Sequence, residues 1–369
     1  MCVNYPLYNP AIGVAKKISM QIDSFCKLGY DVTYSAYLHD GVAILRKGVV
    51  LRKKQINNKR MNNMFRRFYL LKLCIEYLQI EEKYDIGFIR WDAVDFIFLN
   101  TLSIMRNKCR FVLMDFHGYY PGYKSKGLTG KYIKYMTAFL GSRMSKYVDL
   151  GLTETVERTL FGIKTLPIDT GIDIDLYKPH RYIGDIDELN LISVANERPY
   201  HGLDRIINGL VEYYASENKP KKVYLHLVGK LSPETKRIIK NSGLKSIKTY
   251  GYLSGDALDN IYSRCNIGLG PLATYRTGGK QGTGIKTKEY FAIGMPYVYA
   301  GNELLVPDDY PYVLKISDNG GIIDINMLIH FYEKILRFGN IQKDMRCFAK
   351  ENFSWDKIFE SALKMMGAV

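Results

Sequence analysis

Residues 278–296 read GGKQGTGIKTKEYFAIGMP, a loop with four glycines that runs into a segment with helical spacing. Glycine has no Cβ atom, so the backbone N–H groups of such a loop can come close to a ligand. The start of a helix adds free N–H groups and a partial positive charge, and phosphate is the usual occupant of such a site. The stretch therefore predicts a phosphate-binding loop followed by a helix.

Charged residues on the first turn of this predicted helix refine the expectation. Lys286 and Lys288 add positive charge, and Glu289 follows them directly. An acid beside a phosphate site usually binds a hydroxyl group. The predicted helix ends shortly afterwards, at Gly294 and Pro296. Phosphate and hydroxyl recognition together indicate a nucleotide or a nucleotide-sugar.

Composition sets the broad class of the protein. The chain has 369 residues, 47% of them apolar, which favours two domains. A formal net charge of +15 favours polyanionic partners such as nucleic acid, anionic lipid or phosphorylated substrates. The six cysteines show no CxxC pair, which is typical of buried free thiols in a reducing cytoplasm. We expect no signal peptide and no membrane span, hence a cytoplasmic protein that is soluble or peripheral on a membrane.

Short apolar runs alternate with helix-length amphipathic stretches, which predicts an α/β protein with parallel sheets. Turn residues between 169 and 187 indicate a connection between two Rossmann-like domains, at 1–175 and 176–354. Strands are expected at 2–5, 31–36, 86–89, 110–114, 147–152, 189–194, 222–228, 247–250, 267–269 and 297–300. Helices are expected at 14–28, 203–216, 233–241, 255–265 and 286–293.

A basic segment at 41–75 contains ten Lys or Arg residues and no acid. Within it, apolar side chains recur at helical spacing and basic side chains flank them. One interpretation is an amphipathic helix that lies on an anionic membrane, and the other is an ordinary surface helix with a solvated face. The apolar positions are Met61, Met64, Phe65, Phe68, Leu71 and Ile75, and the flanking cations are Arg66, Arg67 and Lys72.

Three segments of the chain resemble glycosyltransferase family 4, whose members are retaining enzymes of the GT-B fold. They are GIKTKEYFAIGMP at 284–296, SVANERPYHGLDRIINGL at 193–210 and the linker-like DTGIDIDLYKP at 169–179. The resemblance implies two Rossmann-like domains with parallel sheets that face each other across a cleft. NFSWDKI at 352–358 resembles the closing segment of the family, which implies that the last helix, 355–369, packs back on the N-terminal domain.

The resemblance implies donor-binding roles for the glycine-rich loop. Glu289 takes the place of the acid that binds the ribose hydroxyls, whereas Gln281 stands where the family has its first acid. A glutamine side chain can still donate and accept hydrogen bonds, but it carries no charge. The remaining expected donor contacts of this loop are Gly282, Thr283, Gly284 and Ile285.

The strand–loop–helix at 193–210 resembles the segment that binds the donor diphosphate. Asn196 and His201 take the positions of an arginine and a lysine, and Arg198 can supply the missing guanidinium. His201 either donates a hydrogen bond to the ligand, with a charge that depends on pH, or merely caps the following helix. At 250–272 the resemblance implies that Gly251 and Tyr252 contact the nucleotide base.

The N-terminal half carries looser matches. NPAIGVAKKI at 9–18 resembles the loop that faces the donor β-phosphate, with backbone N–H groups from Gly13 and Val14 at a helix start and assistance from Lys16 and Lys17. LMDFHGYYPGY at 113–123 lies where the family contacts its acceptor. His117 is the candidate catalytic histidine of the cleft. Expected acceptor contacts, at or after strand ends, are Arg90, Asp115 and Tyr119.

The expected reaction moves a hexose-type sugar from a UDP- or GDP-sugar to a hydroxyl of a saccharide, with retention. Arg198, Lys286 and helix N-termini would stabilise the departing diphosphate, so neither a metal ion nor another cofactor is expected. The acceptor would be a saccharide linked to polyprenyl diphosphate on an anionic membrane, as in bacterial surface polysaccharide synthesis.

Three alternatives stay open from the sequence. The substitutions at Gln281 and Asn196 are compatible with a non-catalytic, nucleotide-sugar-binding partner subunit. A UDP-sugar 2-epimerase of the GT-B fold would share the phosphate loops. A basic nucleic-acid-binding protein is disfavoured, because the 30 tyrosines are scattered and no RNA-binding motif is present.

Overall fold

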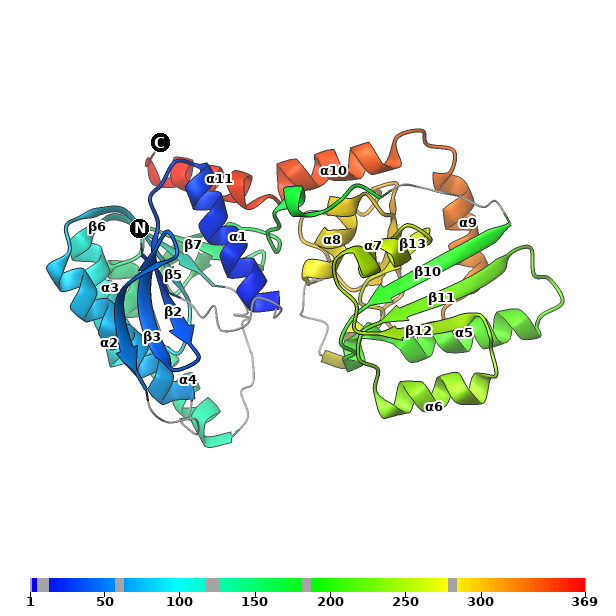
Figure 1. Ribbon diagram of the computed structural model, residues 1–369, viewed down its shortest axis with the longest axis horizontal. Helices are drawn as coiled ribbons and strands as arrows, with labels where there is room; N and C mark the ends of the chain where they lie inside the picture. The colour runs from blue at the N-terminus through cyan, green and yellow to red at the C-terminus, as the bar shows by residue number, and fades with distance from the viewer. Residues whose placement is uncertain are drawn as a thin grey trace. The chain divides into compact units, whose positions relative to one another are not determined.

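The chain forms two compact units, Met1–Gly171 with Trp355–Val369 and Ile172–Ser354 (Figure 1). The computed structural model describes residues 2–4, 13–56, 63–116, 127–180, 187–277 and 284–368. The domain boundary expected at 175 lies four residues after the observed one at Gly171. Among the described residues, none of the helices combines the length and hydrophobicity needed to cross a bilayer.

Unit 1 is built on a nine-stranded sheet in the order β4-β3-β2-β1-β5-β6-β7-β9-β8. The neighbouring strands β2, β1, β5, β6, β7 and β9 pair in parallel. At the two edges of the sheet, β3 pairs antiparallel with β2 and β4, and β8 pairs antiparallel with β9. The strand bounds are β1 Cys2–Asn4, β2 Thr33–Leu38, β3 Gly41–Arg46, β4 Val49–Gln55, β5 Tyr84–Arg90, β6 Cys109–Asp115, β7 Leu150–Thr153, β8 Thr159–Leu160 and β9 Ile163–Pro167. The helices are α1 Gly13–Lys27, α2 Asn63–Ile80, α3 Phe96–Lys108, α4 Gly127–Leu140, the 3-10 helix η1 Gly141–Lys146, and α11 Trp355–Met366.

The hairpin of β3 and β4 was not among the expected strands. Lys47 and Gly48 both have positive φ, at 50° and 78°, which suits the two-residue turns that match the twist of a hairpin. β3 is buried, and β4 is an exposed edge strand. The basic residues of β4 therefore lie on a sheet edge, where charge protects against pairing with other chains.

Only part of the apolar stripe expected for a membrane-bound helix packs into unit 1, since Phe65 and Phe68 are 61% and 45% exposed. Within α2, Leu71 joins the main core cluster, and Leu70, Cys74 and Tyr77 form a second cluster with β3. Arg67 is buried and forms ion pairs of 2.7 Å with Asp92 and 2.7 Å with Asp95. The expectation that Arg67 and Leu71 face a membrane was wrong, because the helix needs this face to cover its own sheet.

The C-terminal helix α11 packs against α1 within unit 1 (Figure 1). The rings of Phe25 and Phe359 stack with their centroids 3.9 Å apart, and Trp355 is buried. Gly171 lies directly against the Trp355 ring, so a Cβ atom at this position would come within 2.4 Å of the indole. This packing joins the end of the chain to the first unit.

Unit 2 contains a six-stranded sheet in the order β12-β11-β10-β13-β14-β15, with every described pair parallel. Its strands are β10 Glu188–Val194, β11 Lys222–Val228, β12 Ile247–Gly251, β13 Ile267–Leu269, β14 Tyr297–Ala300 and β15 Val313–Ile316. Its α-helices are α5 Leu203–Ala215, α6 Pro233–Ser242, α7 Asp256–Tyr262, α8 Ile285–Ile293, α9 Ile325–Ile335 and α10 Ile341–Asn352, and its 3-10 helices are η2 Ile174–Leu176, η3 Pro199–His201 and η4 Thr274–Thr277.

Counted along the chain, the sheet of unit 2 has the Rossmann strand order 3-2-1-4-5-6. The predicted strands of this unit agree with the observed ones to within one residue, and β15, α9 and α10 are additional. α8 ends at Gly294, whose φ of 79° is left-handed, and a Cβ atom there would lie 2.7 Å from Gln342. α8 can therefore stop abruptly and pack against α10.

Candidate functional site

The strand order of unit 2 places a candidate site at the carboxyl ends of β10 and β13. In a sheet of order 3-2-1-4-5-6, connections run to opposite sides after strands 1 and 4, and ligands bind in the crevice that opens between them. The loop after β10 carries Asn196, Arg198 and His201, and the loop after β13 leads to α8. The segments singled out by the sequence therefore converge at this point of the fold.

These two loops are tied together by hydrogen bonds. The N–H of Ala273 donates to the carbonyl of Tyr200 over 3.0 Å. The guanidinium of Arg276 donates to the carbonyl of Pro199 over 3.2 Å and holds both carboxylate oxygens of Asp204, at 2.8 and 2.7 Å. The segment with η3 is therefore held in place before any ligand arrives. Arg276 was not among the expected site residues.

Lys286 lies on the first turn of α8, with Gly284 as the N-cap residue. Its ammonium nitrogen is buried and has no hydrogen-bond partner among the described residues. Burial lowers the pKa of Lys286 to about 7, against a smaller opposing effect of the Glu289 carboxylate. The free N–H groups of a helix start and an unpartnered cation thus coincide, as expected for an anion site. The space beside Gly284 is open.

Lys288 has the opposite role, although it lies only two residues further along the same helix. Its ammonium donates to Glu303 over 2.6 Å, and both side chains are fully buried. It also lies 4.8 Å from the centre of the Phe353 ring. Residues i and i+2 point to different sides of a helix, so one lysine reaches the site and the other the core. Lys288 therefore stabilises unit 2 and does not contact a ligand.

Glu289 is held by Tyr177, which follows η2. The hydroxyl of Tyr177 donates to Oε1 of Glu289 over 2.8 Å. Burial, and then the charge of Glu289, raise the pKa of Tyr177 far above its ordinary value, so the hydroxyl stays a neutral donor. Tyr177 was not expected in the site, because its segment was interpreted as a linker. The contact spans 112 residues of sequence, and no local signal predicts it.

His201 is buried at the end of η3, and its Nδ1 accepts the backbone N–H of Arg198 over 2.8 Å. Burial, followed by the positive charges of Lys286 and Arg198, lowers its pKa to about 3. The ring is therefore neutral near pH 7 and carries its proton on Nε2. The charge of His201 therefore depends on pH only well below neutrality. The alternative role was capping of the following helix α5, whereas the ring accepts the backbone N–H of Arg198 at the start of η3.

The other expected donor contacts of unit 2 lie on its surface. The side chains of Arg198 and Asn196 are exposed, and Oδ1 of Asn196 accepts the N–H of Lys230 over 3.3 Å. Gly251 ends β12 with a φ of 66°, a left-handed conformation that favours glycine. Tyr252 follows with its side chain 67% exposed, so its ring is accessible to a planar ligand.

In unit 1, the expected acceptor contact Asp115 is 1% exposed. Its carboxylate accepts a hydrogen bond from Gln21 over 3.2 Å and lies 3.8 Å from the ammonium of Lys17. Lys17 is also buried and reaches Glu154 at 3.4 Å. Asp115 and Lys17 thus position α1 against the sheet, and a direct ligand contact of either stays a prediction. α1 begins at Gly13, so the N–H groups of Gly13 and Val14 lie at a helix start, as expected.

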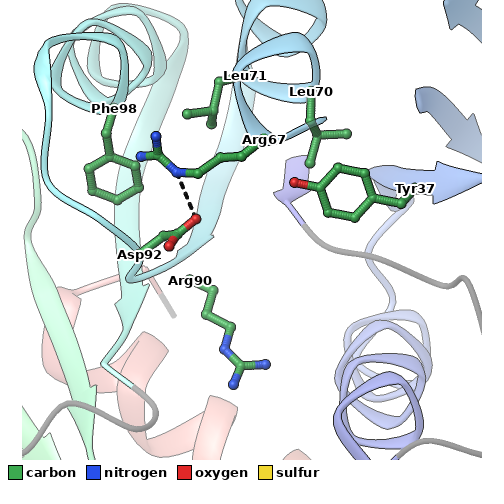
Figure 2. Close-up of a pocket in the computed structure, with 7 residues that line it drawn as sticks. All are labelled: Tyr37, Arg67, Leu70, Leu71, Arg90, Asp92 and Phe98. Carbon is green, nitrogen blue, oxygen red and sulfur yellow. Dashed lines mark hydrogen bonds and ion pairs between the residues drawn. The ribbon is translucent and has the colours of Figure 1, made fainter. Parts of the chain in front are cut away.

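Arg90 lies at the end of β5 and lines a small pocket (Figure 2). Figure 2 shows its guanidinium pointing away from the Arg67–Asp92 ion pair. The other residues that line the pocket are Tyr37, Arg67, Leu70, Leu71, Asp92 and Phe98. The pocket has a volume of about 10 Å³, room for about one water molecule, and the role expected for Arg90 stays a prediction.

Several expected residues lie outside the described part of the chain: His117, Tyr119, Gln281, Gly282 and Thr283. Within the described ranges, no cluster of three or more His, Cys, Asp or Glu side chains is arranged to hold a metal ion. The expectation that the reaction uses no metal ion stays a prediction.

Comparison with solved structures identifies the fold. HepE from Anabaena, solved with UDP, superposes with a TM-score of 0.64 at 13% identity, over 100% of this chain and 99% of that one. A glycosyltransferase from Rickettsia africae gives 0.66 at 15% identity, over 99% and 97%. An Escherichia coli structure described as trehalose-6-phosphate, bound with UDP-2-fluoro glucose, gives 0.58 at 12% identity, over 99% of each chain. No family profile and no curated protein matches the chain.

The chain therefore has the GT-B fold of two Rossmann-like domains, as expected. Its structural neighbours are glycosyltransferases of this fold, and they do not single out family 4. One further neighbour, with a TM-score of 0.54 at 11% identity, is a putative UDP-N-acetylglucosamine 2-epimerase from Listeria monocytogenes.

Proposed function

We propose that the protein is a glycosyltransferase that uses a nucleotide-sugar donor. The observation that carries the proposal is the meeting of three groups at the switch point of unit 2. They are the buried ammonium of Lys286, which has no partner within the described part of the chain, the start of α8, and the neutral ring of His201. A diphosphate supplies the negative charge that this arrangement lacks. Glu289 lies on the same helix as Lys286 and accepts a hydrogen bond from Tyr177, and its carboxylate would accept hydrogen bonds from the ribose hydroxyls. Neighbours of the same fold were solved with UDP and UDP-glucose.

In the proposed reaction, the bond between the anomeric carbon and the diphosphate oxygen breaks, the acceptor oxygen forms the new bond to that carbon, and the proton of the acceptor hydroxyl passes to the departing diphosphate. The leaving group is a nucleoside diphosphate. Lys286 and Arg198 stabilise the charge that develops on it, and Nε2–H of His201 can donate to a phosphate oxygen. The sugar passes through an oxocarbenium-like transition state. We write the reaction with retention, for a hexose-type sugar, and without a metal ion, as the resemblance to family 4 implies.

The proposed acceptor is a saccharide carried on polyprenyl diphosphate, and the pathway is the assembly of a bacterial surface polysaccharide. A formal charge of +15 supports an anionic partner. Arg90, at the carboxyl end of β5, would offer a guanidinium for an acceptor phosphate. We accordingly propose a cytoplasmic protein, peripheral on the inner face of the membrane.

Donor binding and sugar transfer can be tested in sequence. A thermal-shift screen of nucleoside diphosphates and their sugars identifies the donor, because ligands that bind the folded state raise the apparent stability. Radiolabelled transfer from that donor to membrane extract then tests catalysis. We expect transfer by the native chain and none by the variant with both Lys286→Ala and Glu289→Ala. Transfer that survives the double substitution contradicts the proposal.

Two alternatives predict other outcomes. A non-catalytic partner subunit, which the uncharged Asn196 leaves open, would show a thermal shift with the donor but no transfer. An epimerase, the activity named for one structural neighbour, would change the C2 configuration of a UDP-sugar without an acceptor, which NMR detects. Either result would replace the transferase proposal.

Tyr177→Phe tests whether Glu289 recognises the ribose. We expect native protein to prefer the diphosphate found in the screen over its 2′,3′-dideoxy analogue by about tenfold or more, since a hydrogen bond to a charged group contributes about 1.5–3 kcal/mol. Without the Tyr177 hydroxyl, Glu289 loses its fixed orientation, and the preference should shrink about three- to tenfold. Isothermal titration calorimetry with both ligands measures this ratio.

Tyr132→Phe is the matched control for Tyr177→Phe, since it also removes one hydroxyl but from an exposed ring of unit 1. Its ratio of affinities should equal that of the native protein. If Tyr177→Phe lowers thermal stability while the ratio stays unchanged, Tyr177 only supports the fold and has no positioning role.

A further inference from the structure

The outer face of α4 presents aromatic rings to solvent. Tyr132, Tyr135 and Phe139 are 44%, 72% and 63% exposed. Their spacing of three and four residues places them on one side of the helix. Next to them on the helix, Met136 packs against the core of unit 1, and Leu140 is buried in it. α4 therefore has one broad apolar face, and packing of the described residues covers only its edge with Met136 and Leu140.

Cations surround the exposed rings. Lys131 and Lys134 are exposed on α4, and Arg143 and Lys146 are exposed on η1. The guanidinium of Arg143 lies 5.1 Å from the centre of the Phe139 ring, and none of the four cations forms an ion pair with a described residue. The sequence contains no Asp or Glu between Phe116 and Val148. The face is aromatic and uniformly positive.

The cations of α2, the helix first expected on the membrane, are already engaged within the protein. Arg67 is paired with Asp92 and Asp95, and Arg66 donates to the carbonyl of Leu38 over 3.2 Å. Lys72 lies 4.0 Å from Glu76. The four cations of α4 and η1 have no such acidic neighbours among the described residues, so their charge remains available to a partner.

We propose that the exposed face of α4 and η1 docks unit 1 on an anionic lipid surface. This inference rests on the proposed peripheral location and names the surface responsible for it. Tyrosine and phenylalanine rings enter the interfacial layer of a bilayer, while Lys and Arg extend to the anionic headgroups. Each cation near such a surface contributes about fivefold in affinity. A nucleic acid would demand charge along a continuous groove, which this single convex helix face does not supply.

Vesicle co-sedimentation tests the proposal with the full-length chain. We expect binding to vesicles of phosphatidylcholine that contain roughly 30% phosphatidylglycerol, a mixture that imitates the charge of an anionic leaflet. Vesicles of phosphatidylcholine alone should bind little. Lys131→Glu with Lys134→Glu should weaken binding about tenfold or more, because two attractions become repulsions. Tyr135→Ser with Phe139→Ser should weaken it about tenfold through the loss of apolar insertion.

The matched control is Lys236→Glu with Lys240→Glu, which makes the same change of net charge on exposed positions of α6 in unit 2. It should bind anionic vesicles within about twofold of the native protein, as expected for charges that take no part in the proposed contact. Weakening equal to that of the α4 variants would overturn the proposal in favour of a general effect of net charge. The absence of binding between the native protein and anionic vesicles would also overturn it.

Two further measurements separate other causes. Light scattering after size exclusion reports the oligomeric state. If the native protein is a dimer and Tyr135→Ser with Phe139→Ser makes it a monomer, the face binds a second copy of the chain. That outcome contradicts the proposal. The thermal shift with the donor nucleotide should be unchanged in both α4 variants. If the α4 variants lose vesicle binding but keep this thermal shift, the result supports docking by α4. If the native protein binds vesicles but no nucleotide, only the proposed transferase function is contradicted.

Discussion

Replacing Lys286 by methionine is expected to lower kcat by about 10²–10³-fold, the range seen when one preorganised charge or donor is removed from a leaving-group site. The same substitution should not weaken the fold. The ammonium is buried and has no partner among the described residues, and its pKa of about 7 lies below the ordinary value of 10.5, so folding disfavours its charged form. Removing it should raise the free energy of unfolding of the ligand-free protein by about 1–3 kcal/mol at pH 7.

The depressed pKa of Lys286 also sets the sign of a pH dependence. A bound diphosphate stabilises the charged ammonium, so binding takes up a proton wherever Lys286 is neutral in the free protein, that is above pH 7. Affinity should fall as the pH rises from 7 to 9, by up to about tenfold per unit. The charge of Glu289 opposes the lowering of the pKa of Lys286 and raises the pKa of Tyr177. The charges of Lys286 and Arg198 lower the pKa of His201. His201, with a pKa of about 3, does not titrate in this range.

Calorimetry in two buffers of different ionisation enthalpy measures this proton uptake directly, and chemical denaturation measures the stability. Lys286→Met should abolish both the uptake and the slope of affinity above pH 7. Lys286→Arg serves as the control that retains a charge throughout, and it should bind without the slope. Native-like kcat in Lys286→Met, or a stability loss as large as its loss of activity, would show that Lys286 is not the diphosphate cation.

Lys288→Met is expected to have the opposite outcome: a large loss of stability, about 3–5 kcal/mol, because Glu303 is left as a buried charge without its partner. For a domain of this size, such a change lowers the melting temperature by roughly 6–20 °C. Urea denaturation followed by circular dichroism measures the loss. The donor affinity of the molecules that remain folded should be close to native, since Lys288 does not reach the site.

The double variant Lys288→Met with Glu303→Leu distinguishes an ion-pair effect from a packing defect. When both charges leave a buried pair, apolar replacements of similar volume are often neutral or stabilising. The double variant should therefore recover most of the stability lost by Lys288→Met. A single variant as stable as the native protein, or a double variant that is worse than the single one, would contradict the role assigned to this pair.

Secondary structure was predicted well where local patterns are strong. The strands and helices of unit 2 before α9 follow from short apolar runs, turn residues and glycine stops, and α8 begins and ends within one residue of its prediction. The hairpin of β3 and β4 was missed, although Lys47 and Gly48 between two apolar runs are a recognisable turn signal.

The candidate site was predicted as a set of segments, whereas its contacts depend on long-range packing. The glycine loop, the position of Glu289 on a helix and the diphosphate segment before α5 could be inferred from the chain. Tyr177 could not, because its partner lies 112 residues away. Nor could the neutral state of His201 near pH 7, which results from burial beside Lys286 and Arg198.

The sequence by itself determined the alternation of strands and helices, the glycine-rich start of α8 and the residues placed on its first turn. These features depend on backbone preferences and periodicity, which act over a few residues. Only the tertiary structure decided that Lys286 faces the site while Lys288 pairs with Glu303, and that Arg67 serves the interior of unit 1. The reason is electrostatic: the role of a charged side chain depends on burial and on its partner, and both come from parts of the chain that are distant in sequence.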